Sequence, residues 1–96
     1  MHNYEAVFIF NPELSSDAYK GSLTQVQEIV QKNGGRIEGV QEWGKRRLAY
    51  KIGKKQDGTY AILNFQMDPK QTKKMEQTLK LNEDILRFMV VNKDNL

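Results

Sequence analysis

Turn-forming residues divide this chain of 96 residues into six short segments, and their order restricts the possible topologies. Gly and Asn tolerate positive φ angles and Pro lacks a backbone N–H, so these residues end helices and strands. No linker or repeat separates the segments, and we expect residues 1–96 to form a single domain. The breaks fall at Asn11-Pro12, Asn33-Gly34-Gly35, Gly53, Asp57-Gly58, Asp68-Pro69 and Asn82.

Four segments have the composition of β-strands, with many aromatic and β-branched residues. They are Tyr4–Phe10, Ile37–Ile52, Thr59–Met67 and Ile85–Val91. The second is long for a strand, and we expect a bend at Gly39 or Gly44. Asp57-Gly58 is a strong turn signal that predicts a hairpin between the second and third strands.

The other two segments have the spacing of amphipathic helices. Ser15-Ser16-Asp17 supplies an N-cap for the first helix, and Asn33-Gly34 ends it. Its apolar stripe recurs every three or four residues, at Tyr19, Leu23, Val26 and Val30. Asp68-Pro69 predicts the start of a second helix. The stripe of that helix is formed by Thr72, Met75 and Leu79.

The resulting order is β-α-β-β-α-β, in which two strand–helix–strand units share a central hairpin. This order predicts an α+β protein with the ferredoxin-like βαββαβ fold. We expect a four-stranded antiparallel sheet with both helices on one face.

The strands are apolar on both faces, although two helices can cover only one. A sheet with one wet face alternates apolar and polar residues, and these strands do so poorly. The larger rows are expected under the helices, which leaves a second apolar row uncovered. An exposed apolar patch of several hundred Å² marks an interaction site, so we predict a protein partner, either a second copy or another protein. The predicted patch is formed by Val7, Ile9, Ala49, Tyr60, Ile62, Met89 and Val91.

The modest net charge of +3 conceals a basic segment in the middle of the chain. Residues 1–35 hold two basic and four acidic side chains, residues 36–55 hold seven and two, and residues 56–96 hold six and six. Trp43 and Tyr50 are interleaved with the central basic residues, a pattern that favours nucleic-acid binding over a merely solvated surface. The candidate phosphate contacts are Lys45, Arg46, Arg47, Lys51, Lys54 and Lys55.

Residue types that carry catalysis are scarce. The chain has no cysteine, and this excludes disulfides, thiolate metal sites and a cysteine nucleophile. It has one histidine, His2. Gly34-Gly35 ends a helix instead of starting one and is therefore not a phosphate loop. Glu83-Asp84 is a carboxylate pair without further ligands. We expect no enzyme activity, no cofactor, no metal and no small-molecule substrate.

No apolar run reaches the ~20 residues that a membrane-spanning helix needs. The first residues also lack the basic and apolar regions of a signal peptide. We therefore expect a soluble intracellular protein, in the cytoplasm or an organelle, with no membrane partner.

The same element order occurs in the RNA recognition motif, whose third-strand aromatics stack on bases. Here the third strand has one extra residue after Gly58 and carries Ile62 at the central stacking position, so Tyr60 alone remains. A free-standing single-strand RNA binder of that kind is one alternative. A small-molecule regulatory domain of the same fold is another, but it leaves the basic strand unexplained.

Several runs taken together resemble a known family. Tyr4-Glu5 opens the first strand and Asn11-Pro12 ends it, and the run from Trp43 to Ile52 reads Trp-Gly-Lys-Arg-Arg-Leu-Ala-Tyr-Lys-Ile. The pattern continues through Gly58-Thr59-Tyr60, Arg87 and Met89-Val90-Val91. Over essentially its whole length the chain resembles the sixth-protein family of the bacterial small ribosomal subunit.

The resemblance implies a ferredoxin-like fold without catalysis or cofactor. It also implies binding to small-subunit ribosomal RNA on the ribosome, together with ribosomal protein eighteen, which covers part of the sheet. The family's first-strand RNA contacts map to His2 and Tyr4, and Arg87 is counted with the RNA-binding residues. His2 stands where the family usually has Arg, and a neutral His contributes less charge at pH 7.

Overall fold

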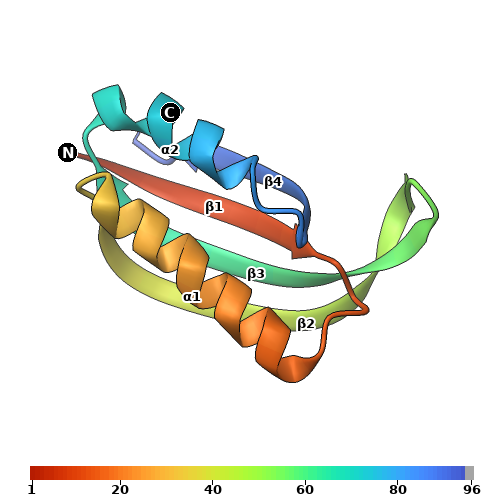
Figure 1. Ribbon diagram of the computed structural model, residues 1–96. Helices are drawn as coiled ribbons and strands as arrows, with labels where there is room; N and C mark the ends of the chain where they lie inside the picture. Colours follow the sequence, from red (N-terminus) through yellow and green to blue (C-terminus); the bar gives the residue numbers. More distant parts are fainter. Residues whose placement is uncertain (95–96) are drawn as a thin grey trace.

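Strands and helices alternate in the predicted order in the computed structural model, which describes residues 1–94 (Figure 1). All strand pairs are antiparallel and the sheet order is β2-β3-β1-β4. Both helices lie on one face, which we call the helix face, and the other is the open face (Figure 1). The predicted ferredoxin-like α+β fold is confirmed. The elements are β1 (His2–Phe10), α1 (Ser16–Lys32), β2 (Arg36–Ile52), β3 (Lys55–Met67), α2 (Thr72–Leu79) and β4 (Ile85–Asn92).

Helix α1 is capped at both ends by the residues that the sequence indicates. The Ser15 hydroxyl oxygen accepts a hydrogen bond from the Ala18 N–H at 3.1 Å. At the other end Gly34 has φ +80, and its N–H donates to the carbonyl of Gln31 at 3.0 Å. The Gly35 N–H reaches the Val30 carbonyl at 2.9 Å, which completes a Schellman motif.

The second helix begins more gradually than the sequence predicts. The Asp68 side chain accepts a hydrogen bond from the Lys70 N–H at 3.0 Å, as an N-cap does. The turn Pro69–Gln71 that follows is a 3₁₀ helix, and α2 proper starts only at Thr72. None of the helices within residues 1–94 is long and apolar enough to cross a membrane.

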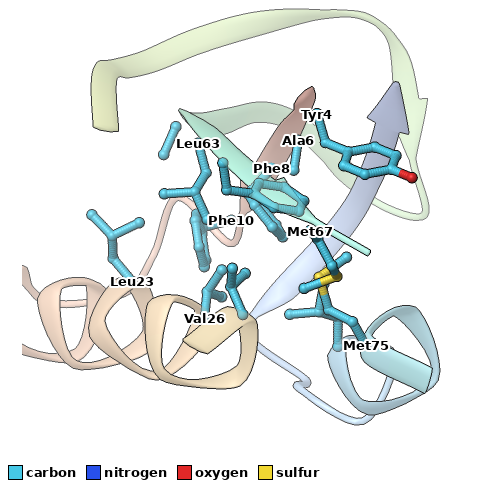
Figure 2. Close-up of a cluster of buried hydrophobic side chains, with 13 residues drawn as sticks. Tyr4, Ala6, Phe8, Phe10, Leu23, Val26, Leu63, Met67 and Met75 are labelled. Atoms are coloured by element: carbon cyan, nitrogen blue, oxygen red, sulfur yellow. The ribbon is translucent and has the colours of Figure 1, made fainter. Parts of the chain in front are cut away.

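The core lies between the helix face and the two helices (Figure 2). Along β1 and β3 large side chains lie opposite small ones, because Phe8 is paired with Ala61 and Leu63 with Ala6. Each large apolar side chain buried in this way contributes about 1.5–3 kcal/mol. The fully buried large side chains are Phe8, Phe10, Val26, Val30, Leu63, Phe65, Met67, Met75 and Leu79.

The predicted hairpin turn at Asp57-Gly58 is wrong. Ile52 is paired with Lys55, so the turn is Gly53-Lys54, with Gly53 at φ +59. Asp57 and Gly58 continue β3 and are paired with β2. Because β1 ends opposite Thr59, residues 46–58 form a two-stranded extension paired with no other strand, which we call the hairpin arm (Figure 1).

Gly58 is required for close packing and not for a turn. A Cβ atom at this position would lie 2.3 Å from Cγ2 of Ile9 and 3.3 Å from Cδ2 of Leu48. The first distance is far inside van der Waals contact, so only glycine lets the base of the hairpin arm approach β1 this closely.

The pairing of strand β2 shifts at three places, two of them where a bend is expected and a third between Arg47 and Ile52 in the hairpin arm. Between Glu42, opposite Ala61, and Gly44, opposite Tyr60, Trp43 is an extra residue, and Gly44 has φ +78. A similar shift occurs before Gly39. Side chains alternate between faces along a strand, so each extra residue reverses the alternation of everything after it.

We predict that Gly58→Ala lowers the free energy of unfolding by about 1–3 kcal/mol, because the added methyl group overpacks the contact with Ile9. The measurement is urea unfolding. Gly39→Ala is the matched control: it is also a strand glycine, but a Cβ there meets nothing within 4 Å. Adding Ile9→Ala should recover part of the loss, and equal stability of the two glycine variants would contradict the packing role.

We predict that Tyr19→Phe changes the pH dependence of stability. The Tyr19 hydroxyl is buried without a hydrogen-bond partner among the described residues. Burial raises the pKa of Tyr19 to about 12, with a contribution from Glu42. This contribution to stability is fully present below pH ~10, the unfolded pKa, and is lost as pH rises toward 12. Chemical unfolding across this range should show a shallower decline for Tyr19→Phe, and parallel curves would contradict the assignment.

Candidate nucleic-acid and partner interfaces

Side chains of three strands meet in rows on the open face. Val7 of β1 lies opposite Ile62 of β3 and Met89 of β4. The next row contains Ile9, which lies opposite Tyr60 and Arg87. Directly opposed residues of antiparallel strands project to the same side, so these residues share one surface, together with Val91.

The members of this surface differ in how much of each a partner could reach. Met89 is 60% exposed and Val91 41%, whereas Ile62 is only 6% exposed despite facing the open side. Val7, Ile9 and Tyr60 are half-buried. Docking energy would therefore come mainly from the β4 and β1 side of the face.

Ala49 lies at the margin of the expected patch, where it lines a small cavity together with Ile9 and Tyr60. After the bulge at Trp43, Arg46 lies opposite Gly58 on the open side. The side chain of Leu48 also lies against Gly58. Ala49 itself is exposed and lies between Arg47 and Ile52, where the pairing of β2 with β3 shifts again. Leu48 lines the same cavity and adds an apolar side chain that the sequence pattern does not place there.

The hairpin arm is attached to the open face through Tyr50 and Arg87. Arg87 Nη1 donates to the Tyr50 hydroxyl at 2.5 Å, and its guanidinium carbon lies 5.5 Å from the centre of the Tyr50 ring. Beside this contact is an open cavity of about 390 Å³. It is lined by Val7, Ile9, Tyr50, Arg87, Phe88 and Met89.

The predicted phosphate-binding residues gather on the hairpin arm and its base. Residues 45–55 contain six basic side chains and no acid. Lys45 and Arg47 project to the helix side, whereas Arg46 projects to the open side. Lys51 and Lys54 are exposed near the tip. Positive charge is thus displayed on both sides of the arm.

One of these charges is already paired. The Lys55 ammonium donates to the Glu13 carboxylate, and this hydrogen bond, aided by the charges of Lys55 and Lys45, lowers the pKa of Glu13. The exposed ion pair links the loop after β1 to the hairpin turn. Lys55 is therefore a weaker phosphate-binding candidate than its neighbours.

His2 and Tyr4 lie far from the arm. His2 is opposite Met67, at the other end of β1 from Phe10, about 26 Å away at ~3.3 Å per residue. There its Nδ1 forms a 2.9 Å hydrogen bond with the Asn92 side chain. Tyr4 is 5% exposed and stacks on Phe65 at 5.5 Å, and burial raises its pKa (Figure 2). Its ring is therefore part of the core and not of an exposed RNA-binding surface.

Sequence reasoning left three side chains of this region out of the candidate sites: Trp43, Leu48 and Tyr50. Trp43 and Tyr50 were noted only as aromatic residues among basic ones. Their placement depends on the bulge and on the curvature of the arm, neither of which has a clear sequence signal. Within the described part of the chain, no three His, Asp or Glu side chains are grouped so that they could hold a metal ion.

Comparison with known proteins gives a consistent result. Residues 3–92 match the family described as Ribosomal protein S6. The small ribosomal subunit protein bS6 of Clostridium novyi (strain NT) is 40% identical over 92 residues, covering 96% of this chain and 97% of that protein. The bS6 protein of Thermoanaerobacter pseudethanolicus is 37% identical over 94 residues, covering 98% and 99%.

Solved structures support the fold. The crystal structure of 30S ribosomal protein S6 from Thermotoga maritima has a TM-score of 0.92 at 24% identity, covering 98% of this chain and 89% of that one. The C-terminal domain of the Mycobacterium tuberculosis MgtC protein has a TM-score of 0.64 at 9% identity, covering 99% and 90%. The fold is thus shared with a protein of a different name.

The chain is therefore a structural protein of the small ribosomal subunit, a class that is not enzymatic. Within that class it belongs to the ribosomal protein S6 family.

Proposed function

We propose that the chain binds small-subunit ribosomal RNA through its hairpin arm and ribosomal protein eighteen through its open face. It would act during assembly of the ribosome in the bacterial cytoplasm. The observation that carries the proposal is the hairpin arm itself. It projects beyond the sheet, displays basic side chains on both sides, and adjoins an apolar surface that no helix covers (Figure 1).

The arm is suited to RNA phosphates. Arg46 and Arg47 project to opposite sides, so they can contact two segments of backbone or the two sides of one groove. A guanidinium offers paired N–H donors that match phosphate oxygens. Such contacts fix the position of the protein without reading bases. His2, at the other end of β1, would be a separate contact, and Tyr4 is left out because its ring is buried.

The open face is suited to a protein partner. Its most exposed non-aromatic apolar side chains, Met89 and Val91, lie on the edge strand β4, and the half-buried Val7 and Ile9 lie beside them. Arg87 borders both this surface and the arm. RNA and partner would therefore bind side by side, and their contributions to affinity would add.

The RNA role is tested by Arg46→Ala combined with Arg47→Ala. Binding of the joint complex with protein eighteen to small-subunit RNA is measured at several salt concentrations. Loss of two phosphate contacts should reduce the slope of log affinity against log salt by about 1–2. Lys73→Ala with Lys74→Ala, on α2, is the control and should leave the slope unchanged. An unchanged slope for the arginine variant would rule out the phosphate role.

The partner role is tested by Met89→Asp. Because Met89 is exposed, the monomer should stay within about 0.5 kcal/mol of wild-type stability. Binding to protein eighteen, measured by calorimetry, should weaken at least about tenfold, or ~1.4 kcal/mol. Ile62→Asp is unsuitable, because it would place a carboxylate at a buried position. Leu81→Asp, an exposed apolar residue outside β4, is the control, and equal affinities would contradict the assignment.

A further inference from the structure

Three side chains at the base of the hairpin arm border an open cavity at the surface, and Trp43 among them has no part in the proposed function. Trp43, Arg46 and Tyr60 line about 430 Å³ of space. This volume lies within the range of about 300–1,000 Å³ that is typical of small-ligand sites. The three residues meet there because Tyr60 lies opposite Gly44 and Arg46 lies opposite Gly58, both on the open side.

The bulge places Trp43 at this cavity. Trp43 is the extra residue between two regular pairs of β2 and β3, a position at which strands commonly redirect a side chain. Its indole is 50% exposed, and its Nε1 donates to Gln41 Oε1 at 3.4 Å. A large aromatic side chain is therefore held at the surface, beside a second aromatic ring and a permanent positive charge.

Stacking rings next to a cation are the combination by which proteins bind unpaired bases. Aromatic faces stack on any base, and an arginine beside them holds the phosphate. We propose that this cavity holds one unpaired nucleobase of an RNA strand, stacked on Trp43 and bordered by Tyr60, with Arg46 on the adjoining phosphate. The proposal rests on RNA binding by the hairpin arm and adds the kind of RNA feature recognised next to it.

The surrounding charge favours RNA over a side chain of a protein partner. Arg46 is the one charged side chain among the described residues that line the cavity, so a partner's arginine or lysine would be repelled there, whereas a phosphodiester chain would be attracted. The rest of the open face is aliphatic at Val7, Ile9 and Ile62. The site thus takes a single base, in contrast to the extended stacking platform of an RNA recognition motif.

The chain provides its own probe, because Trp43 is its only tryptophan. The full chain is titrated at low salt with a short oligoadenylate, with an abasic phosphodiester chain of equal length, and with double-stranded RNA. We expect the Trp43 fluorescence to change with oligoadenylate and to stay nearly constant with the other two. An equal response to the abasic chain, or no response to oligoadenylate, would overturn the proposal. A response only to added protein eighteen would do the same and would assign the cavity to that partner.

Variants separate this site from the phosphate contacts. Trp43→Ala should weaken oligoadenylate binding about 5- to 150-fold, with the salt slope unchanged, and Trp43→Phe should restore most of the affinity. Circular dichroism and urea unfolding verify that both variants are folded. If Trp43→Ala binds like wild type while Arg46→Ala with Arg47→Ala still reduces the slope, the base site is wrong and the phosphate role stands. If neither variant changes RNA binding, both are wrong.

Discussion

Strand β1 is hydrogen-bonded to a neighbour along each of its edges, and its alternating side chains therefore have to serve two surfaces at once. One row, with Phe8 and Phe10, fills the core beneath α1 and α2. The other row, with Val7 and Ile9, forms the middle of the open face. The helices pack against the first row, and the base of the hairpin arm rests on the second at Ile9. Loss of β1 would therefore remove the support of both surfaces.

Most of the fold follows from local rules that can be applied to the sequence. The period-two rows of β1 and β3 and the caps of α1 depend on neighbouring residues, so Phe8, Ser15 and Gly34 could be interpreted correctly. Gly58 could not, since the atom that excludes a side chain there belongs to Ile9, which is distant in sequence. The Asp57-Gly58 pair has the composition of a hairpin turn, but it lies within β3, where Gly58 allows close packing against Ile9.

Only some of the residues in the candidate sites can be predicted from the sequence by the same local rules. The concentration of charge is a property of the sequence alone, and the basic residues between Lys45 and Lys55 do lie together on the hairpin arm. Assigning each of them to a face requires the positions of the register shifts in β2, which the sequence pattern does not reveal, and Leu48 is for that reason not among the predicted contacts. The family resemblance implies an RNA contact at Tyr4, but a resemblance carries no information on burial. In the structure the Tyr4 ring lies in the core.

The bulge at Trp43 also limits how the length of this strand can change. Removing Trp43 itself would abolish the bulge and leave Lys45 and Arg46 on their present sides, because Glu42 and Gly44 already lie opposite the adjacent residues Ala61 and Tyr60. Insertion or removal of one residue in the regularly paired stretch after the bulge would instead reverse the sides of the residues that follow, whereas a change of two would keep them. Length variation between the bulge and the tip of the hairpin arm should therefore be tolerated in steps of two residues. The side to which each basic residue of the arm projects is therefore determined by the number of residues that separate it from the bulge.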